Sequence, residues 1–168
     1  LGERVVYRGD IEEDERYELY SVPLNRETGS EKLNEPLMPE GGVQSFQISP
    51  DGATVVYAAH EDENQLNELY SVPIDGSVAA KKVNDTLAAG GRVNTFTFSP
   101  DSASVLYAAD QDTAGIRELY IAPSGGGATY LLPGLVEANE SSIPVLGITS
   151  DVPVTSRGKY PLTELDQT

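Results

Sequence analysis

The hydrophobic positions of this chain fall in short runs separated by turn residues. The runs are rich in Val, Tyr and Phe, and segments of Pro, Gly, Asp and Ser lie between them, which is the pattern of β-strands rather than of helices. In the middle of the chain four such runs are expected to be strands: Val43–Ile48, Thr54–Ala59, Glu68–Val72 and Ala80–Val83. The pattern therefore predicts an all-β fold.

The same pattern returns every 50 residues. Glu-Leu-Tyr begins at residues 18, 68 and 118, and Val-Val-Tyr or Val-Leu-Tyr begins at residues 5, 55 and 105. A fainter echo of the first strand follows at residues 143–151. A fixed period of this length indicates a solenoid, propeller or array. We expect three tandem repeats within residues 1–150 (about 4–50, 54–100 and 104–150) and a C-terminal extension at 151–168.

Turn residues within each repeat predict antiparallel hairpins. Ser49-Pro50-Asp51-Gly52 precedes the second strand and Pro73-Ile74-Asp75-Gly76 follows the third. Pro presets φ near −65° and Gly accepts a positive φ, as such turns require. Since the sequence begins at a second strand, we expect three complete four-stranded sets, each completed by the first strand of the following period. Consecutive apolar residues such as Val55, Val56 and Tyr57 predict sheets that are covered on both faces.

These features resemble the propeller repeats of TolB and of the propeller domains attached to prolyl-oligopeptidase-type peptidases. The resemblance covers about residues 4–150 and rests on the Ser-Pro-Asp-Gly turn, the Val-Val-Tyr strand and the Glu-Leu-Tyr strand. It implies tandem four-stranded antiparallel blades. Propellers close with four to eight blades, so three units imply a partial propeller that other copies or further sequence would complete.

Charge narrows the range of partners. With 27 acidic and 11 basic residues the formal charge is −16, which repels nucleic acid and anionic membrane surfaces. No run of residues is long and apolar enough to span a bilayer. Cysteine is absent, which excludes disulfides and thiolate chemistry. We expect protein partners, either other copies of the chain or the rest of a longer propeller, and a secreted, periplasmic or cell-surface location.

The loop between the second and third strands is acidic in every copy. Oxygen donors at alternate positions suggest calcium, which prefers six to eight oxygen ligands. The best candidate ligands lie in the third copy: Asp110, Asp112 and Glu118. The alternative is a solvated hairpin loop whose charges keep sheet edges soluble. No other cofactor is expected.

Catalytic residues are not evident. His60 is the single histidine and lies at a loop position that holds Asp in the other copies, so we expect an exposed residue and no Ser-His-Asp triad. The repeated tyrosines are expected to pack in the core. We therefore predict a non-catalytic module for protein binding or self-assembly into an oligomer or filament; the alternative is the propeller portion of a larger enzyme such as a prolyl-oligopeptidase-type serine peptidase.

Overall fold

The structure, a computed structural model, describes residues 4–25, 28–62, 66–126 and 130–131, and every regular element in these ranges is a β-strand. The strands are β1 (Arg4–Gly9), β2 (Glu18–Pro23), β3 (Glu31–Lys32), β4 (Val43–Ile48), β5 (Thr54–Ala59), β6 (Glu68–Pro73), β7 (Lys81–Lys82), β8 (Val93–Phe98), β9 (Ser104–Ala109), β10 (Glu118–Pro123) and β11 (Tyr130–Leu131). The chain divides into two compact units, Leu1–Tyr130 and Leu131–Thr168. Apart from Leu131 at the end of β11, the strands belong to the first unit.

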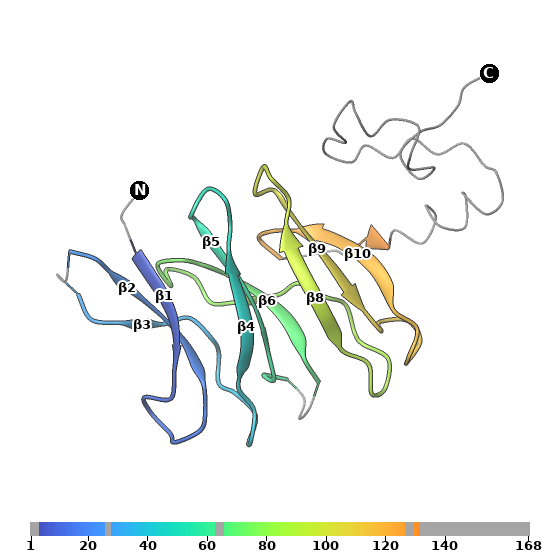
Figure 1. The fold of residues 1–168 in the computed structure, drawn as a ribbon, viewed down its shortest axis with the longest axis horizontal. Coiled ribbons are helices and arrows are strands. Elements are labelled where there is room, and N and C mark those ends of the chain that lie inside the picture. Colours follow the sequence, from blue (N-terminus) through green and yellow to red (C-terminus); the bar gives the residue numbers. More distant parts are fainter. Residues whose placement is uncertain (1–3, 26–27, 63–65, 127–129, 132–168) are drawn as a thin grey trace, which may run out of the picture. The chain divides into compact units, whose positions relative to one another are not determined.

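The strands form three antiparallel sheets (Figure 1). Sheet 1 has the order β1-β2-β3, sheet 2 has β4-β5-β6-β7 and sheet 3 has β8-β9-β10-β11. The all-β prediction is thus confirmed, and the four strands expected in the middle copy are all present. The fourth is shorter than expected, since the strand covers only Lys81–Lys82 in place of Ala80–Val83. The expected repeat over residues 132–150 and the extension at 151–168 lie outside the described residues.

The prediction that each sheet is completed by the first strand of the following period is wrong. β4 pairs with β5, with Phe46 opposite Tyr57, and does not complete sheet 1, which keeps three strands. The reason is the tight turn at residues 49–52. Gly52 adopts a φ of 72° and donates its N–H to the Ser49 carbonyl at 2.8 Å, while the Ser49 hydroxyl bonds Asp51 at 2.6 Å. A turn this short joins neighbouring strands of one sheet.

The apolar core lies between the sheets. One cluster joins sheets 1 and 2 and comprises Leu19, Leu33, Leu37, Val43, Val55, Tyr57, Ala59, Tyr70 and Val72. A second joins sheets 2 and 3 and comprises Val56, Ala58, Leu69, Val83, Leu87, Val93, Phe96, Val105, Tyr107, Ala109, Tyr120 and Ala122. Sheet 2 contributes to both clusters, so it is covered on both faces, as the apolar run at 55–57 predicted.

The repeated tyrosines pack as predicted. Each sheet carries a stacked tyrosine pair on two neighbouring strands, β1 and β2, β5 and β6, or β9 and β10. The ring centroids are 5.6, 5.5 and 5.3 Å apart for Tyr7 with Tyr20, Tyr57 with Tyr70, and Tyr107 with Tyr120. Offset aromatic stacking at this separation stabilises packing beyond the area buried.

Repeated asparagines satisfy buried backbone groups where the chain leaves the short fourth strand. The Asn84 side-chain oxygen accepts the Leu69 N–H at 2.6 Å, and Asn34 accepts the Leu19 N–H at 2.7 Å. A buried N–H without a partner costs about 1–3 kcal/mol, so these side chains stabilise the outer part of sheets 1 and 2. The residue 50 positions after Asn84 is Gly134, so the repeated asparagine is absent from the third copy.

Candidate functional site

The two outermost sheets each expose an apolar residue whose equivalents are buried in the inner interfaces. We call the face of a sheet toward the preceding sheet its N-face and the face toward the following sheet its C-face. The N-face of sheet 2 holds Val43, Val55, Tyr57, Ala59, Tyr70 and Val72. Its C-face holds Val56, Ala58, Leu69, Val83 and Leu87. Each inner interface therefore joins the C-face of one sheet to the N-face of the next.

Comparing the exposed fraction of residues that lie 50 positions apart shows which sheet faces have no adjacent sheet. On the N-face, Val55 and Val105 are 0% exposed, whereas Val5 of sheet 1 is 42% exposed. On the C-face, Leu19 and Leu69 are 0% exposed, whereas Leu119 of sheet 3 is 47% exposed. Within the described residues, then, the N-face of sheet 1 and the C-face of sheet 3 are the two halves of an interface that the chain builds twice internally. We call them the end faces.

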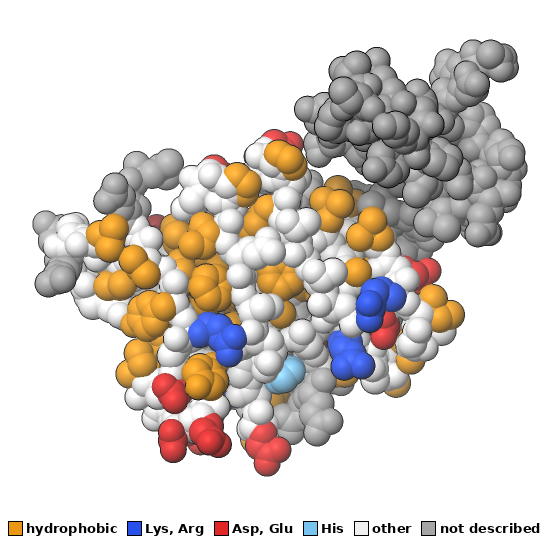
Figure 2. Space-filling view, viewed as in Figure 1, with side chains coloured by type: hydrophobic (Ala, Val, Ile, Leu, Met, Phe, Trp, Pro, Cys, Tyr) orange, Lys and Arg blue, Asp and Glu red, His pale blue; other side chains and the backbone are white. Residues whose placement is uncertain are grey.

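Charge is distributed unevenly around sheet 1. Figure 2 shows acidic side chains gathered at the lower edge, below a surface of hydrophobic side chains on the same side of the molecule. That edge corresponds to the loop between β1 and β2, where Glu12, Glu13, Asp14 and Glu15 are exposed. The predicted solvated acidic loop is present here, beside an apolar face.

Inner interfaces also contain a polar link that the sequence patterns did not single out. The Glu61 carboxylate accepts the Tyr57 hydroxyl at 2.7 Å and, across the interface, the Glu35 N–H of sheet 1 at 3.1 Å. Gln111 does the same one repeat later, accepting the Tyr107 hydroxyl at 2.9 Å and the Asp85 N–H at 3.1 Å. The sequence pattern that could have predicted this link is a hydrogen-bond acceptor side chain four residues after the tyrosine, as in Glu61 after Tyr57 and Gln111 after Tyr107.

The first repeat has no such acceptor. Ile11 stands at the position of Glu61 and is 63% exposed, and the Tyr7 hydroxyl bonds Ser30 at 2.8 Å instead. The polar link is thus found only where a sheet has a predecessor. Sheet 1 differs from the inner sheets in this polar element as well as in its exposed apolar face.

Burial shifts the ionisation of Glu61. The side chain is only 8% exposed, and desolvation raises its pKa to about 7, although the hydrogen bonds from Tyr57 and from the Glu35 backbone oppose the shift. Glu61 therefore carries a proton in part of the population near neutral pH. It belongs to the acidic loop of the second copy, so that loop is not wholly solvated.

The predicted calcium ligands lie in different surroundings. Asp110 is 8% exposed and its carboxylate accepts from Asn94 at 3.2 Å. Glu118 accepts the Tyr120 hydroxyl at 3.0 Å. Burial and this hydrogen bond raise the pKa of Tyr120, and the charge of the exposed Asp112 adds to the shift. The described part of the chain contains no group of three or more His, Cys, Asp or Glu side chains arranged to hold a metal ion. Calcium binding by Asp110, Asp112 and Glu118 stays a prediction.

In each of the first two copies one lysine ammonium group pairs with two carboxylates of the acidic loop. Lys82 contacts Glu68 and Asp62, both at 2.6 Å. Lys32 likewise contacts Glu18 at 2.8 Å and Glu12 at 2.7 Å. In the third copy the equivalent position is Leu132. The acidic loops of the first two copies are therefore each paired with a lysine, whereas the third copy has no lysine at the equivalent position.

His60 is placed differently from the prediction. It is partly buried, which lowers its pKa, and its backbone carbonyl accepts the Met38 N–H of the preceding repeat at 2.9 Å. The expectation of an exposed loop histidine was therefore wrong, because the loop is drawn into the interface between sheets 1 and 2. The hydrogen bond to Met38 is a structural contact made by the backbone of His60.

Solved structures with the same arrangement define the fold as β-propeller type. A putative TolB from Agrobacterium tumefaciens has a TM-score of 0.51 at 18% identity, covering 77% of this chain and 44% of that one. A puromycin hydrolase, an S511A mutant in complex with PGG, has a TM-score of 0.50 at 22% identity, covering 70% of this chain and 18% of that one. The chain therefore spans less than half the length of either structure. No curated protein matches.

A second relationship concerns the C-terminal half. The family model described as "Thiamine pyrophosphate enzyme, N-terminal TPP binding domain" matches residues 77–168, which is more than half of the chain, and over this span the chain belongs to that family. The span overlaps the described fold in part, since residues 77–126 and 130–131 lie in sheets 2 and 3 and their loops. Residues 132–168 lie outside the described residues, and there the repeat loses its lysine and asparagine positions.

The described part of the matched span does not fit thiamine pyrophosphate. A diphosphate requires cationic donors or a bound divalent metal ion. Of the four basic residues here, Lys82 is paired with two carboxylates and Arg117 donates to Asn94 at 2.9 Å. The other two, Lys81 on β7 and Arg92 before β8, are exposed and belong to different sheets or loops. A metal-ligand group is absent from the described ranges. We derive no chemistry through this cofactor.

No helix in the described ranges is long and apolar enough to cross a membrane. The expected location outside the cytoplasm stays a prediction.

Proposed function

We propose that the chain is a non-catalytic propeller-type module whose end faces bind further sheets of the same kind, in other copies of the chain or in the rest of a longer propeller. The proposal is based on two apolar residues of the end faces that are exposed although the residues one repeat away are buried. Val5 and Leu119 are 42% and 47% exposed, whereas their equivalents in the inner interfaces are fully buried. A surface of this kind is favourable to cover, at about 25 cal/mol per Å² of apolar area.

The two end faces are complementary rather than alike. A C-face meets an N-face at both inner interfaces, so the free C-face of sheet 3 is expected to meet the free N-face of sheet 1 in a second copy. Such a contact is heterologous and generates a ring if the rotation closes and a filament if it does not. Two copies would bring together six sheets, a number within the range of closed propellers.

Light scattering over a dilution series tests the proposal. We expect the wild-type chain to associate, and Val5→Asp and Leu119→Asp each to reduce association by about tenfold or more, because a charge would be buried without a partner. Val78→Asp makes the same change at a valine that is 53% exposed in a loop of sheet 2, away from both end faces, and serves as the control.

A mixture of the two variants separates head-to-tail contact from other modes. Val5→Asp retains an intact C-face and Leu119→Asp retains an intact N-face, so the mixture should form a heterodimer that does not grow further. A wild-type chain that stays an 18 kDa monomer at all concentrations would overturn the proposal of self-association, and so would an equal effect of Val78→Asp.

The second candidate is a portion of a larger enzyme. Two observations favour it: the family match over residues 77–168 to a thiamine pyrophosphate enzyme domain, and the likeness of the fold to a puromycin hydrolase of which the chain covers 18%. Titration calorimetry of the full chain with thiamine pyrophosphate and Mg²⁺ tests the first of these. Saturable binding would favour the enzyme candidate, and its absence at millimolar ligand would favour the non-catalytic module.

A further inference from the structure

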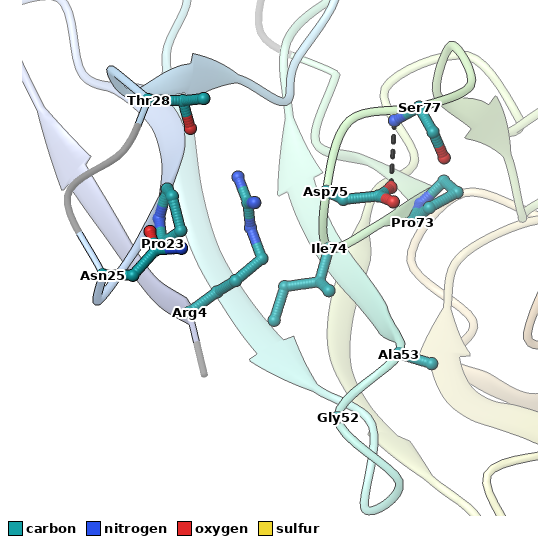
Figure 3. A pocket seen from close by; sticks show the side chains of 10 residues that line it. All are labelled: Arg4, Pro23, Asn25, Thr28, Gly52, Ala53, Pro73, Ile74, Asp75 and Ser77. Carbon is teal, nitrogen blue, oxygen red and sulfur yellow. Dashed lines mark hydrogen bonds between the residues drawn. The ribbon is translucent and has the colours of Figure 1, made fainter. Parts of the chain in front are cut away.

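A pocket on the rim between sheets 1 and 2 departs from the repeat in its charged residues. It has a volume of about 530 Å³ and is lined by Arg4, Pro23, Asn25, Thr28, Gly52, Ala53, Pro73, Ile74, Asp75 and Ser77. In Figure 3 the Arg4 side chain projects between the loop that bears Thr28 and the turn that bears Asp75. The volume lies in the range of small-ligand sites, about 300–1,000 Å³.

The matching position between sheets 2 and 3 gives an internal control. The pocket there has about 220 Å³ and is lined by Thr54, Ser71, Pro73, Val78, Ala79, Lys81 and Gly125. Thr54 stands one repeat after Arg4, and Gly125 stands one repeat after Asp75. Pro73 lines the second pocket one repeat after Pro23, and the cation there is Lys81, at a different position from Arg4. The pairing of Arg4 with Asp75 is not repeated at Thr54 and Gly125. Residues that only hold the sheets together would be expected to repeat, so this pair calls for another explanation.

Local hydrogen bonds hold both charges in place. The Arg4 Nε donates to the Ser21 hydroxyl at 2.8 Å. At the equivalent position Ser71 instead donates to the Ser124 carbonyl of the next sheet. Asp75 accepts the Ser77 N–H at 3.0 Å, the turn interaction drawn in Figure 3. None of the ion pairs among the described residues joins Arg4 to Asp75. Hydrogen bonds from Ser77 lower the pKa of Asp75, and the Arg4 charge across the pocket adds to that shift. Each side chain is thus oriented by its own sheet and presents charge to the space between them.

We propose that this rim pocket binds a short peptide with free termini, its carboxylate on Arg4 and its ammonium on Asp75. A guanidinium matches a carboxylate through paired N–H donors, and the Asp75 carboxylate accepts from an ammonium. Ile74 supplies apolar surface between the two charges for a side chain, as Figure 3 shows, and Pro23 and Pro73 line the pocket beside them. Opposite charges on opposite walls select a zwitterion over a simple anion, which the net charge of −16 would repel.

The dipeptide glycyl-leucine is the probe, titrated into the full chain by NMR or calorimetry. N-acetyl-glycyl-leucine lacks the ammonium, and glycyl-leucinamide lacks the carboxylate. We expect saturable binding of the dipeptide at millimolar concentration or below. Each blocked analogue is expected to bind about tenfold more weakly, because one charge-assisted contact is lost.

Two variants show which charge each end of the dipeptide contacts. Each replaces the charged residue by the residue found one repeat later, Thr54 or Gly125. Arg4→Thr should erase the preference for glycyl-leucine over the amide while keeping the preference over the acetylated form; Asp75→Gly should do the reverse. Arg117→Thr removes the same charge as Arg4→Thr from a surface residue of sheet 3 and should change neither. The readout is a ratio of affinities, so a general loss of folding does not imitate it.

Absence of saturation at millimolar dipeptide would overturn this proposal, and so would equal affinities for the three compounds or an Arg117→Thr effect equal to that of Arg4→Thr. These outcomes leave the end-face proposal untouched, because that proposal concerns Val5 and Leu119, which do not line the pocket.

Discussion

Sheet 2 and its two neighbours have closely similar sequences in very different surroundings. Leu69 in sheet 2 is fully buried, whereas Leu119, the same residue one repeat later, is 47% exposed. Val5 and Val55 differ in the same way on the opposite face. Local sequence and strand geometry are the same in each pair, so the difference comes from the presence or absence of an adjacent sheet. In a stacked repeat the energetic role of a residue depends on its place in the array.

The largest difference in stability is expected between replacements of these two leucines. Leu69→Ala should lower the free energy of unfolding by about 2–5 kcal/mol, since it removes a buried side chain and leaves a cavity. Leu119→Ala should cost under about 1 kcal/mol in dilute protein, where its face is open. Urea unfolding followed by circular dichroism measures both. Equal costs in dilute protein would mean that Leu119 is covered within the single chain.

A second prediction uses Glu61 and its counterpart Gln111, which make the same two hydrogen bonds. Burial raises the pKa of Glu61 from 4.5 to about 7, so folding favours the protonated form. Its stabilising contribution is complete below about pH 4.5 and is lost as the pH rises through about 7. A shift of this size corresponds to roughly 3 kcal/mol at most, and it already includes the opposing effect of the two hydrogen bonds.

The variant Glu61→Gln should therefore match wild type near pH 4.5 and exceed it in melting temperature at pH 8. Glutamine retains an acceptor for Tyr57 and for the Glu35 N–H without a titrating charge, as Gln111 does in the next interface. Glu12→Gln, at an exposed acid of the first loop, is the matched control and should not reproduce this change. A pH profile identical for Glu61→Gln and wild type would contradict the assignment.

The smallest expected effect concerns the valines. Val55→Thr should destabilise the chain by about 1–2 kcal/mol, because a hydroxyl is buried among apolar side chains. Val5→Thr should change the stability of the single chain by no more than about 0.5 kcal/mol. Denaturant unfolding at low protein concentration compares them. A cost for Val5→Thr that grows with protein concentration would sharpen the comparison, since it would show that association buries the N-face of sheet 1.

Much of the fold could be predicted from local features. The strands at residues 43–48 and 54–59 follow from apolar patterning, and the turn between them follows from Pro50 and Gly52, whose φ of 72° is one that glycine adopts readily. These are short-range effects that recur with the period, so each copy confirms the others. The candidate site was less accessible, because Glu61 and Gln111 look like two more polar loop residues until an adjacent sheet buries them.

The period, the strands, the turns and the core position of the repeated tyrosines could be predicted from the amino-acid sequence, because they follow from local patterns that recur with the repeat. The folded structure was needed to show that the tyrosines stack in pairs, that β4 joins β5 and leaves sheet 1 with three strands, that His60 lies partly buried, and that Arg4 faces Asp75 across a rim pocket. The last two of these depend on how one sheet sits against the next. That arrangement brings together residues as distant in sequence as Arg4 and Asp75, a separation over which hydrophobic periodicity carries no information.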